Sequence, residues 1–277
     1  KFSSASWTRD GQGFFYSRYA EPAAGEQFQS LNTNQKVYFH RLGSAQSTDV
    51  LAYERPDQPT WGFTPQVSDD GRFLVITVWV GTDDRYRILY RDLDQPYSFP
   101  IELIPNFDNL YGFLGNDGPV FYFLTDVEAT RRRIVAIDIR KPQREHWKEL
   151  VAQSADTLEA AGIVGNLIVA RYLHDAQTQV KLFTLDGKPF RDVEFEGVVS
   201  ASGFSGHRSD TETFYLVESF AIPRSLYHYD LLRGESKLVH RPRTKFDPDS
   251  FETRQVFYTS KDGTRVPIFL TFRKGLK

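Results

Sequence analysis

Residue types that serve serine, metal and acid–base chemistry occur in this chain, but not in the spacing that such chemistry requires. A serine nucleophile of the hydrolase type sits on a Gly-x-Ser-x-Gly turn, with its acid and histidine later in the chain. The sequence has no such motif, and its nearest match is Gly203-Phe204-Ser205-Gly206, followed by His207. This match is one residue short and precedes a β segment, so we interpret it as a turn of small residues.

The histidines and carboxylates also lack a recognised catalytic or metal-binding pattern. None of the six histidines forms an H-x-x-x-H or H-E-x-x-H pair, which argues against zinc. Asp69-Asp70 and Asp83-Asp84 could be the paired acids of a glycosidase. Both pairs are explained more simply by turns, where Asp bonds its own backbone. No calcium loop is present, so we predict no catalytic residue, no metal and no cofactor.

Composition indicates a folded chain without a charged partner. Of 277 residues, 40% are hydrophobic and 15% aromatic, which is enough for a large core. A net charge of -2 favours neither nucleic acid nor an anionic membrane. No apolar run reaches the roughly 18 residues of a membrane-spanning helix, and no secretory signal is recognised.

Sulfur-containing residues are absent, with Cys 0 and Met 0. A disulfide framework, a thiolate nucleophile and Cys-ligated zinc are therefore excluded. A natural chain of this length with neither residue and no initiator Met is unusual. We interpret the chain as an excised domain, an engineered sequence or both, with chance as the alternative.

A β segment recurs along the chain at nearly constant spacing. It is found at residues 37–42, 88–93, 134–139, 180–185 and 226–231, at intervals of 51, 46, 46 and 46 residues. A period of 40 to 50 residues built from short β segments is typical of propeller blades. Each blade has apolar faces that it buries only by stacking on its neighbours.

The other strands of each repeat are found from their turns. Asp10-Gly11, Asp70-Gly71 and Asp117-Gly118 each precede an apolar segment, as a tight hairpin requires. The fourth repeat uses Gly165-Asn166 and the fifth a longer connection. We predict an all-β chain of about five four-stranded blades, with the first lengthened by an inserted loop at residues 20–35. The predicted blades span residues 1–56, 57–104, 105–152, 153–196 and 197–246.

The pattern changes after the fifth repeat. Residues 255–260 and 265–270 are apolar β segments joined by Lys261-Asp262-Gly263-Thr264, which predicts a hairpin. A two-stranded ribbon is barely stable alone. We therefore divide the chain into a propeller at residues 1–250 and a hairpin at 251–277 that belongs to a further domain.

Several segments in the same order resemble the prolyl oligopeptidases, and the resemblance runs along the whole chain. The segments are residues 1–11, 68–72, 172–175, 210–215 and 260–267. These serine peptidases of the cytosol cut short peptides after proline. The resemblance implies a seven-bladed propeller that covers an α/β-hydrolase site and admits only small peptides. This chain is similar to blades three to seven of that propeller, followed by the opening hairpin of the hydrolase domain. The resemblance implies that the rest of the hydrolase domain, which carries the catalytic residues, is absent from this chain.

The resemblance also implies a substrate-subsite wall on the propeller. The matching positions are Phe2, Gly62 and Thr82, of which only Phe2 keeps an aromatic side chain. The simpler interpretation of Phe2 is packing in the propeller core or at a frayed terminus.

Arg131-Arg132-Arg133 is interpreted as a solvated strand edge, with steering of peptides as the alternative. The four tryptophans are expected in blade packing, and Trp79 alternatively at the tunnel or interdomain surface.

Three functions remain open. The first is a non-catalytic, cytoplasmic propeller portion of a prolyl oligopeptidase-like peptidase, which gates access of short proline-containing peptides to the hydrolase domain. The second is an engineered stand-alone propeller that serves as a scaffold or assembly module. The third is a sialidase-type or glycosidase-type enzyme, for which no clustered Arg, paired acid and Tyr are recognised. Expected partners are the hydrolase domain, short peptides and a second copy through exposed first and last blades.

Overall fold

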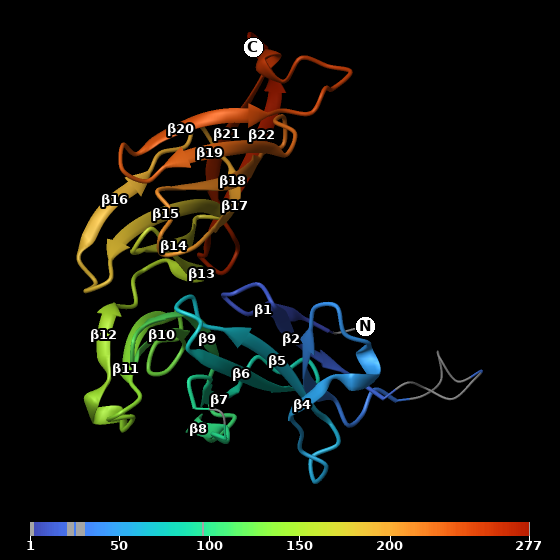
Figure 1. The fold of residues 1–277 in the computed structure, drawn as a ribbon. Coiled ribbons are helices and arrows are strands. Elements are labelled where there is room, and N and C mark those ends of the chain that lie inside the picture. Colours follow the sequence, from blue (N-terminus) through green and yellow to red (C-terminus); the bar gives the residue numbers. More distant parts are fainter. Residues whose placement is uncertain (1–2, 21–24, 26–30, 96, 277) are drawn as a thin grey trace. The chain divides into compact units, whose positions relative to one another are not determined.

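The computed structural model describes residues 3–20, 25, 31–95 and 97–276. This part of the chain forms five four-stranded sheets and a two-stranded ribbon, which confirms the predicted all-β propeller class (Figure 1). The chain separates into unit 1, residues 1–128 with 134–148, and unit 2, residues 129–133 with 149–277. Within the described residues, no helix has the length and apolar character needed to span a membrane.

The strands follow one another across each sheet in chain order. The first sheet contains β1 (Ala5–Trp7), β2 (Gly13–Arg18), β3 (Lys36–Arg41) and β4 (Val50–Tyr53), and the second β5 (Trp61–Val67), β6 (Phe73–Val80), β7 (Arg87–Asp92) and β8 (Ile101–Ile104). The third contains β9 (Tyr111–Asp117), β10 (Val120–Thr125), β11 (Arg133–Asp138) and β12 (Lys148–Val151). The fourth contains β13 (Thr157–Val164), β14 (Leu167–His174), β15 (Gln177–Thr184) and β16 (Pro189–Val193).

The fifth sheet and the ribbon complete the described β structure. The fifth contains β17 (Ser200–Ser205), β18 (Glu212–Glu218), β19 (Ser225–Asp230) and β20 (Glu235–His240), and the ribbon β21 (Phe251–Thr259) and β22 (Arg265–Arg273). Short 3-10 helices are η1 (Gln46–Thr48), η2 (Arg144–His146) and η3 (Pro248–Ser250). The predicted third strands are confirmed as β3, β7, β11, β15 and β19.

The Asp-Gly turns predicted from the sequence join first and second strands. Gly11, Gly71 and Gly118 have φ of 66°, 78° and 52°, a region that glycine adopts at little cost. In the second sheet, Ser68 and Asp70 add side-chain bonds, since the Arg72 amide donates to Asp70 Oδ1 over 3.1 Å. Local turn chemistry thus accounts for the placement of Asp70.

Strand β6 shows why a blade is apolar on both faces. Phe73 and Val75 belong to one buried cluster of unit 1, whereas Leu74 and Ile76 belong to another. All four side chains are at most 1% exposed. Because successive side chains point to opposite faces of a strand, β6 is buried by a neighbouring sheet on each side.

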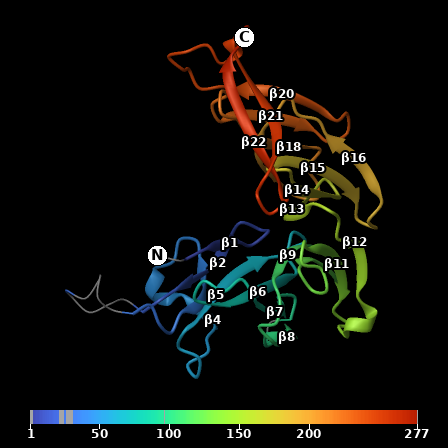
Figure 2. The same cartoon turned by 180° about the vertical axis from the view of Figure 1, so that it is seen from behind.

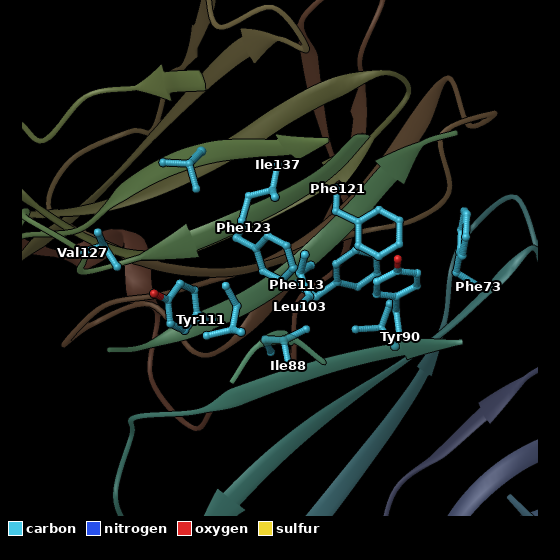
Figure 3. Close-up of a cluster of buried hydrophobic side chains, with 13 residues drawn as sticks. Phe73, Ile88, Tyr90, Leu103, Tyr111, Phe113, Phe121, Phe123, Val127 and Ile137 are labelled. Carbon is cyan, nitrogen blue, oxygen red and sulfur yellow. The ribbon is translucent and has the colours of Figure 1, made fainter. Parts of the chain in front are cut away.

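Aromatic rings fill the first of these clusters. The Phe121 ring lies 5.1 Å from Phe73, 5.6 Å from Tyr90 and 5.3 Å from Phe113, measured between centroids (Figure 3). Edge and tilted ring pairs at such distances stabilise beyond the area that they bury. This cluster ties the second and third sheets together.

In unit 2, a cluster of buried side chains lies between the fourth and fifth sheets, and the ribbon packs on one end of them, seen from the opposite side in Figure 2. In β18, Tyr215 and Val217 are buried while Phe214 is 46% exposed. Within the described part of unit 2, the Phe214 face of the fifth sheet has no sheet packed on it. The period-two pattern of β18 therefore has an apolar residue on its uncovered face.

Two interpretations from the sequence are wrong in detail. Residues 203–206 do not form a turn: Phe204, with φ of 61°, is a β-bulge of β17 whose ring stacks on Tyr215 at 4.6 Å. The Arg131–Arg133 run is not a solvated edge throughout, because Arg132 Nη1 donates to the Glu159 carbonyl over 2.9 Å. Trp7 is 54% exposed but does pack within its blade, because its ring lies 5.1 Å from the Phe14 ring on the paired strand β2.

A polar network lies on the first sheet, where the His40 side chain is only 18% exposed and lies against Asp49. His40 Nδ1 is 2.7 Å from Asp49 Oδ1, and Tyr16 Oη donates to Asp49 Oδ2 over 2.6 Å. Asp49 follows η1, so its side chain, 1% exposed, reaches back onto the sheet. His228 is 26% exposed and 2.8 Å from Glu212.

This network predicts a pH-dependent contribution to stability. Burial alone would raise the pKa of Asp49, but hydrogen bonds from Tyr16 and His40 hold it below its usual 3.8. A depressed pKa means that the ionised carboxylate stabilises the fold above pH 3.8 and stops doing so as pH falls through the folded pKa. Asp49→Asn is expected to lower the free energy of unfolding at pH 7 by about 2 kcal/mol.

Urea unfolding of both proteins between pH 7 and pH 3 checks this prediction. The difference between wild type and Asp49→Asn should shrink as the medium becomes more acidic. A difference that stays constant over the whole range would contradict an ionised Asp49 in the network.

Candidate functional site

One end of each sheet is defined by the start of its first strand and the end of its second strand. In unit 2, the ribbon packs on this end, which we call the ribbon-side end. Gln177 Nε2 donates to Gln255 Oε1 over 2.5 Å, and Gln255 Nε2 donates to the Asp175 carbonyl. Arg265 Nη1 lies 3.4 Å from Asp175 Oδ2. The β14–β15 turn is therefore the polar attachment point of the ribbon.

An aromatic contact attaches the ribbon to the fifth sheet. The Phe220 and Phe269 rings are 5.5 Å apart, although Phe220 remains 68% exposed. Phe220 lies in the β18–β19 connection, which Ser219 orders by accepting the Ile222 amide at its Oγ over 3.1 Å. The ribbon thus touches the corresponding end of both sheets of unit 2.

The β14–β15 turn carries backbone strain. Asp175 and Ala176 have φ of 46° and 63° and lie between the paired residues His174 and Gln177. Both central residues of a type I′ turn need positive φ, which an alanine adopts at a cost. His174 Nδ1 is 2.8 Å from Asp156 Oδ1 and so secures the strand just before this turn.

Ala176→Gly is expected to raise the free energy of unfolding by about 1 kcal/mol, since glycine removes the strain. Thermal unfolding followed by circular dichroism checks this, with a higher midpoint as the expected result. Ala45→Gly is the control, because Ala45 has an ordinary φ of -76° and gains nothing from glycine. A lower midpoint for Ala176→Gly would show that the turn is not strained.

Two of the predicted subsite positions lie at the end of the second sheet where β5 begins and β6 ends. Gly62 is the second residue of β5, and Thr82 is exposed in the loop after β6. Phe2 lies outside the described residues. In the same loop, the hydrogen bond from Arg85 lowers the pKa of Asp83 to about 2. The hydrogen bond between Arg85 and Asp83 within this loop therefore explains Asp83 as a turn residue.

Trp79 occupies the space that a larger residue at position 62 would fill. Gly62 and Trp79 are paired across β5 and β6, and a methyl group on Gly62 would lie 2.2 Å from Trp79 Cε2 and Cζ2. The indole therefore covers the Gly62 backbone. The sequence alone does not pair Trp79 with Gly62, because the pairing depends on the register of β5 on β6.

Gly62→Ala is expected to displace the Trp79 indole and to cost about 1–3 kcal/mol of unfolding free energy. Tryptophan fluorescence should shift in the folded state. Gly112→Ala is the matched control: Gly112 is the second residue of β9, and its added methyl would meet nothing nearer than Leu124 Cβ at 3.8 Å. Unchanged fluorescence in Gly62→Ala would contradict the placement of the indole.

A charged pocket of about 230 Å³ lies at the ribbon-side end of unit 2, between the fourth and fifth sheets. Its polar lining includes Glu159, Arg171, Thr178, Ser202, Glu218 and Arg224. Arg171 Nε is 3.8 Å from Glu159 Oε2. Sequence reasoning did not single out these residues, because they lie far apart in the chain and belong to no recognised motif. Within the described part of the chain, no group of three or more His, Asp or Glu residues is placed to hold a metal ion.

Comparison with known proteins agrees with this arrangement. The family described as "Prolyl oligopeptidase, N-terminal beta-propeller domain" matches residues 1–242. The prolyl endopeptidase of Elizabethkingia meningoseptica is 35% identical over 277 residues, which are 100% of this chain and 39% of that protein. Prolyl oligopeptidase ophP of Omphalotus olearius is 30% identical over 289 residues, 100% of this chain and 38% of the relative.

Solved structures show the same fold. One, from work on inter-domain dynamics in two prolyl endopeptidases, matches with a TM-score of 0.86 and 35% identity over 99% of this chain and 39% of that chain. Prolyl oligopeptidase B from Galerina marginata, bound to a 35mer hydrolysis and macrocyclization substrate, matches with a TM-score of 0.88 at 24% identity, over 100% of this chain and 39% of its own.

The successive four-stranded sheets thus define a β-propeller domain. The chain belongs to the N-terminal β-propeller family of the prolyl oligopeptidases. It spans 39% of the length of the Elizabethkingia relative that it matches.

Proposed function

We propose that this chain is the non-catalytic propeller portion of a prolyl oligopeptidase-type serine peptidase. In this proposal it limits access to an attached α/β-hydrolase domain, so that short proline-containing peptides enter and larger chains do not. Family membership supports the fold and the attachment. The gating role rests on the resemblance, as do the expected cytoplasmic location and the assignment of residues 251–277 to the hydrolase domain.

The proposed attachment to a further domain is supported by one observation: the ribbon is apolar on both faces. One face, with Phe269, contacts unit 2. On the other face, Val256, Tyr258, Ile268 and Leu270 are 37%, 49%, 38% and 45% exposed. A strand with apolar residues on both faces is typical of burial on both sides. We propose that the hydrolase domain covers this second face.

The subsite assignment also remains a proposal. Gly62 and Thr82 would form part of a wall for the residue that precedes the proline-containing segment, with the Trp79 indole as its aromatic surface. Trp79 would then supply what larger side chains at positions 62 and 82 supply in the family. If so, Gly62→Ala should change KM for peptides with a bulky residue at that subsite more than KM for the shortest substrate.

A second candidate is the stand-alone scaffold or assembly module, favoured by the absence of Cys and Met. The exposed Phe214 face would then serve self-association, which analytical ultracentrifugation tests directly. A monomer at high concentration would count against this role.

Hydrolysis of a short blocked Gly-Pro chromogenic peptide tests the principal proposal. The purified chain should show no turnover, and a polypeptide that joins the chain to the hydrolase domain should show turnover that a serine-reactive phosphonate blocks. Phosphonate-sensitive turnover by the chain alone would overturn the non-catalytic assignment.

A further inference from the structure

The charged pocket of unit 2 is shaped by an irregularity in its first strand. The β13–β14 register shifts between Leu158 and Ala160, so Glu159 is a β-bulge. A bulge re-aims its side chain and is common beside functional sites. Glu159 is held by Arg132, which donates to its carbonyl over 2.9 Å, and its side chain lines the pocket.

The guanidinium of Arg171 has a hydrogen-bond donor for which the described part of the surrounding protein supplies no acceptor. Its Nη1 donates to the Ala201 carbonyl over 3.3 Å. Its Nε is buried and has no hydrogen-bond partner among the described residues. Glu159 Oε2, at 3.8 Å, attracts the guanidinium without forming a hydrogen bond to Nε. A buried donor left without an acceptor is costly, so a ligand oxygen here would be favoured.

The opposite wall adds a second cation and a second acid. Arg224 and Glu218 both line the pocket and are exposed, and no ion pair involving either is formed within the described part of the chain. Arg224 is positioned by its loop, since the next residue, Ser225, donates from Oγ to the Pro223 carbonyl over 2.6 Å. The pocket therefore offers two guanidinium groups and two carboxylates.

This lining suits a dipolar ligand better than a simple anion. Two arginines attract a carboxylate or a carbonyl oxygen, and charge-assisted bonds of this kind are strong. The carboxylates accept N–H donors and disfavour a small polyanion such as phosphate. Ser202 and Thr178 add hydroxyls, and Leu173 and Leu216 an apolar surface. A volume of about 230 Å³ accommodates one residue.

We propose that this pocket binds the C-terminal residue of a short peptide, with its carboxylate on Arg171 and Arg224 and its amide near Glu218. The inference rests on the proposed peptide-handling function and deepens it by assigning a second peptide-contact site. The same donors would accept an internal backbone carbonyl more weakly, because a carbonyl carries no charge. A free C-terminus is therefore the preferred ligand, and amidation removes its advantage.

Binding of one fluorescently labelled proline-containing pentapeptide, as free acid and as C-terminal amide, tests this inference on the whole chain. Fluorescence anisotropy should show tighter binding of the acid. Arg224→Gln should weaken acid binding by about tenfold and leave amide binding nearly unchanged. Arg243→Gln, an exposed arginine of unit 2 outside the pocket lining, is the control and should change nothing.

Arg171→Lys gives a second variant in case Arg224 contributes little. It keeps the charge and loses the forked donor geometry, so acid binding should weaken while circular dichroism stays unchanged. Equal binding of acid and amide, or equal affinities in wild type, Arg224→Gln and Arg171→Lys, would overturn the inference. So would the absence of binding by either peptide. None of these results bears on gating, which is measured by hydrolysis in the joined protein.

Discussion

Phe121→Ala is expected to lower the free energy of unfolding by about 4 kcal/mol, the value typical of a large aromatic removed from a packed core. Phe121 is 0% exposed and contacts the rings of Phe73, Tyr90 and Phe113. Its loss would leave a cavity between the second and third sheets that these rings cannot refill. Urea unfolding followed by far-UV circular dichroism measures the change.

Phe214→Ala is the matched control, since Phe214 also lies on a second strand but is 46% exposed. It should cost less than about 1 kcal/mol, because little surface is removed from a packed environment. Similar losses for Phe121→Ala and Phe214→Ala would contradict the difference in burial between these two side chains.

Gly187→Ala is the second substitution with a large expected effect, about 3 kcal/mol or more of unfolding free energy. Gly187 has φ of 89° in the β15–β16 turn, and a methyl group there would lie 2.2 Å from the Leu150 carbonyl oxygen. The clash is with backbone, so no side-chain rotation relieves it. The turn would have to move away from β12, which it now touches.

Gly197→Ala is the control that separates the cost of the steric clash from the cost of placing alanine at positive φ. Gly197 also has positive φ, at 73°, but an added methyl would meet nothing within 4 Å. It should cost only about 1 kcal/mol. Unfolding in urea measures both variants, and equal losses would show that the close approach of Gly187 to Leu150 does not limit stability.

The blade repeat could be predicted because its causes are local. Short apolar runs such as Phe73–Val80, separated by Asp-Gly turns with positive φ, can be recognised without knowledge of distant partners. The bulge at Phe204 could not be predicted, because small residues indicate a turn as readily as an irregular strand. Its ring is placed by stacking on Tyr215, a tertiary contact.

The candidate site was less predictable because it depends on strand register. The pairing of Gly62 with Trp79 requires that β5 and β6 be aligned to the residue. His40 and Asp49 are separated by η1, an irregular segment without a periodic signal. The pocket residues Arg171, on β14, and Arg224, in the β18–β19 connection, are far apart in the chain, and each looks like an ordinary solvated arginine in sequence.

Cleavage of a ladder of proline-containing peptides of increasing length tests the central claim most directly. The enzyme would be the polypeptide that joins this chain to the hydrolase domain, with a serine-reactive phosphonate as control. We expect kcat/KM to fall steeply beyond short peptides, and phosphonate to abolish all cleavage. Equal kcat/KM for short peptides and for a long unfolded protein substrate would contradict a gating role for this propeller.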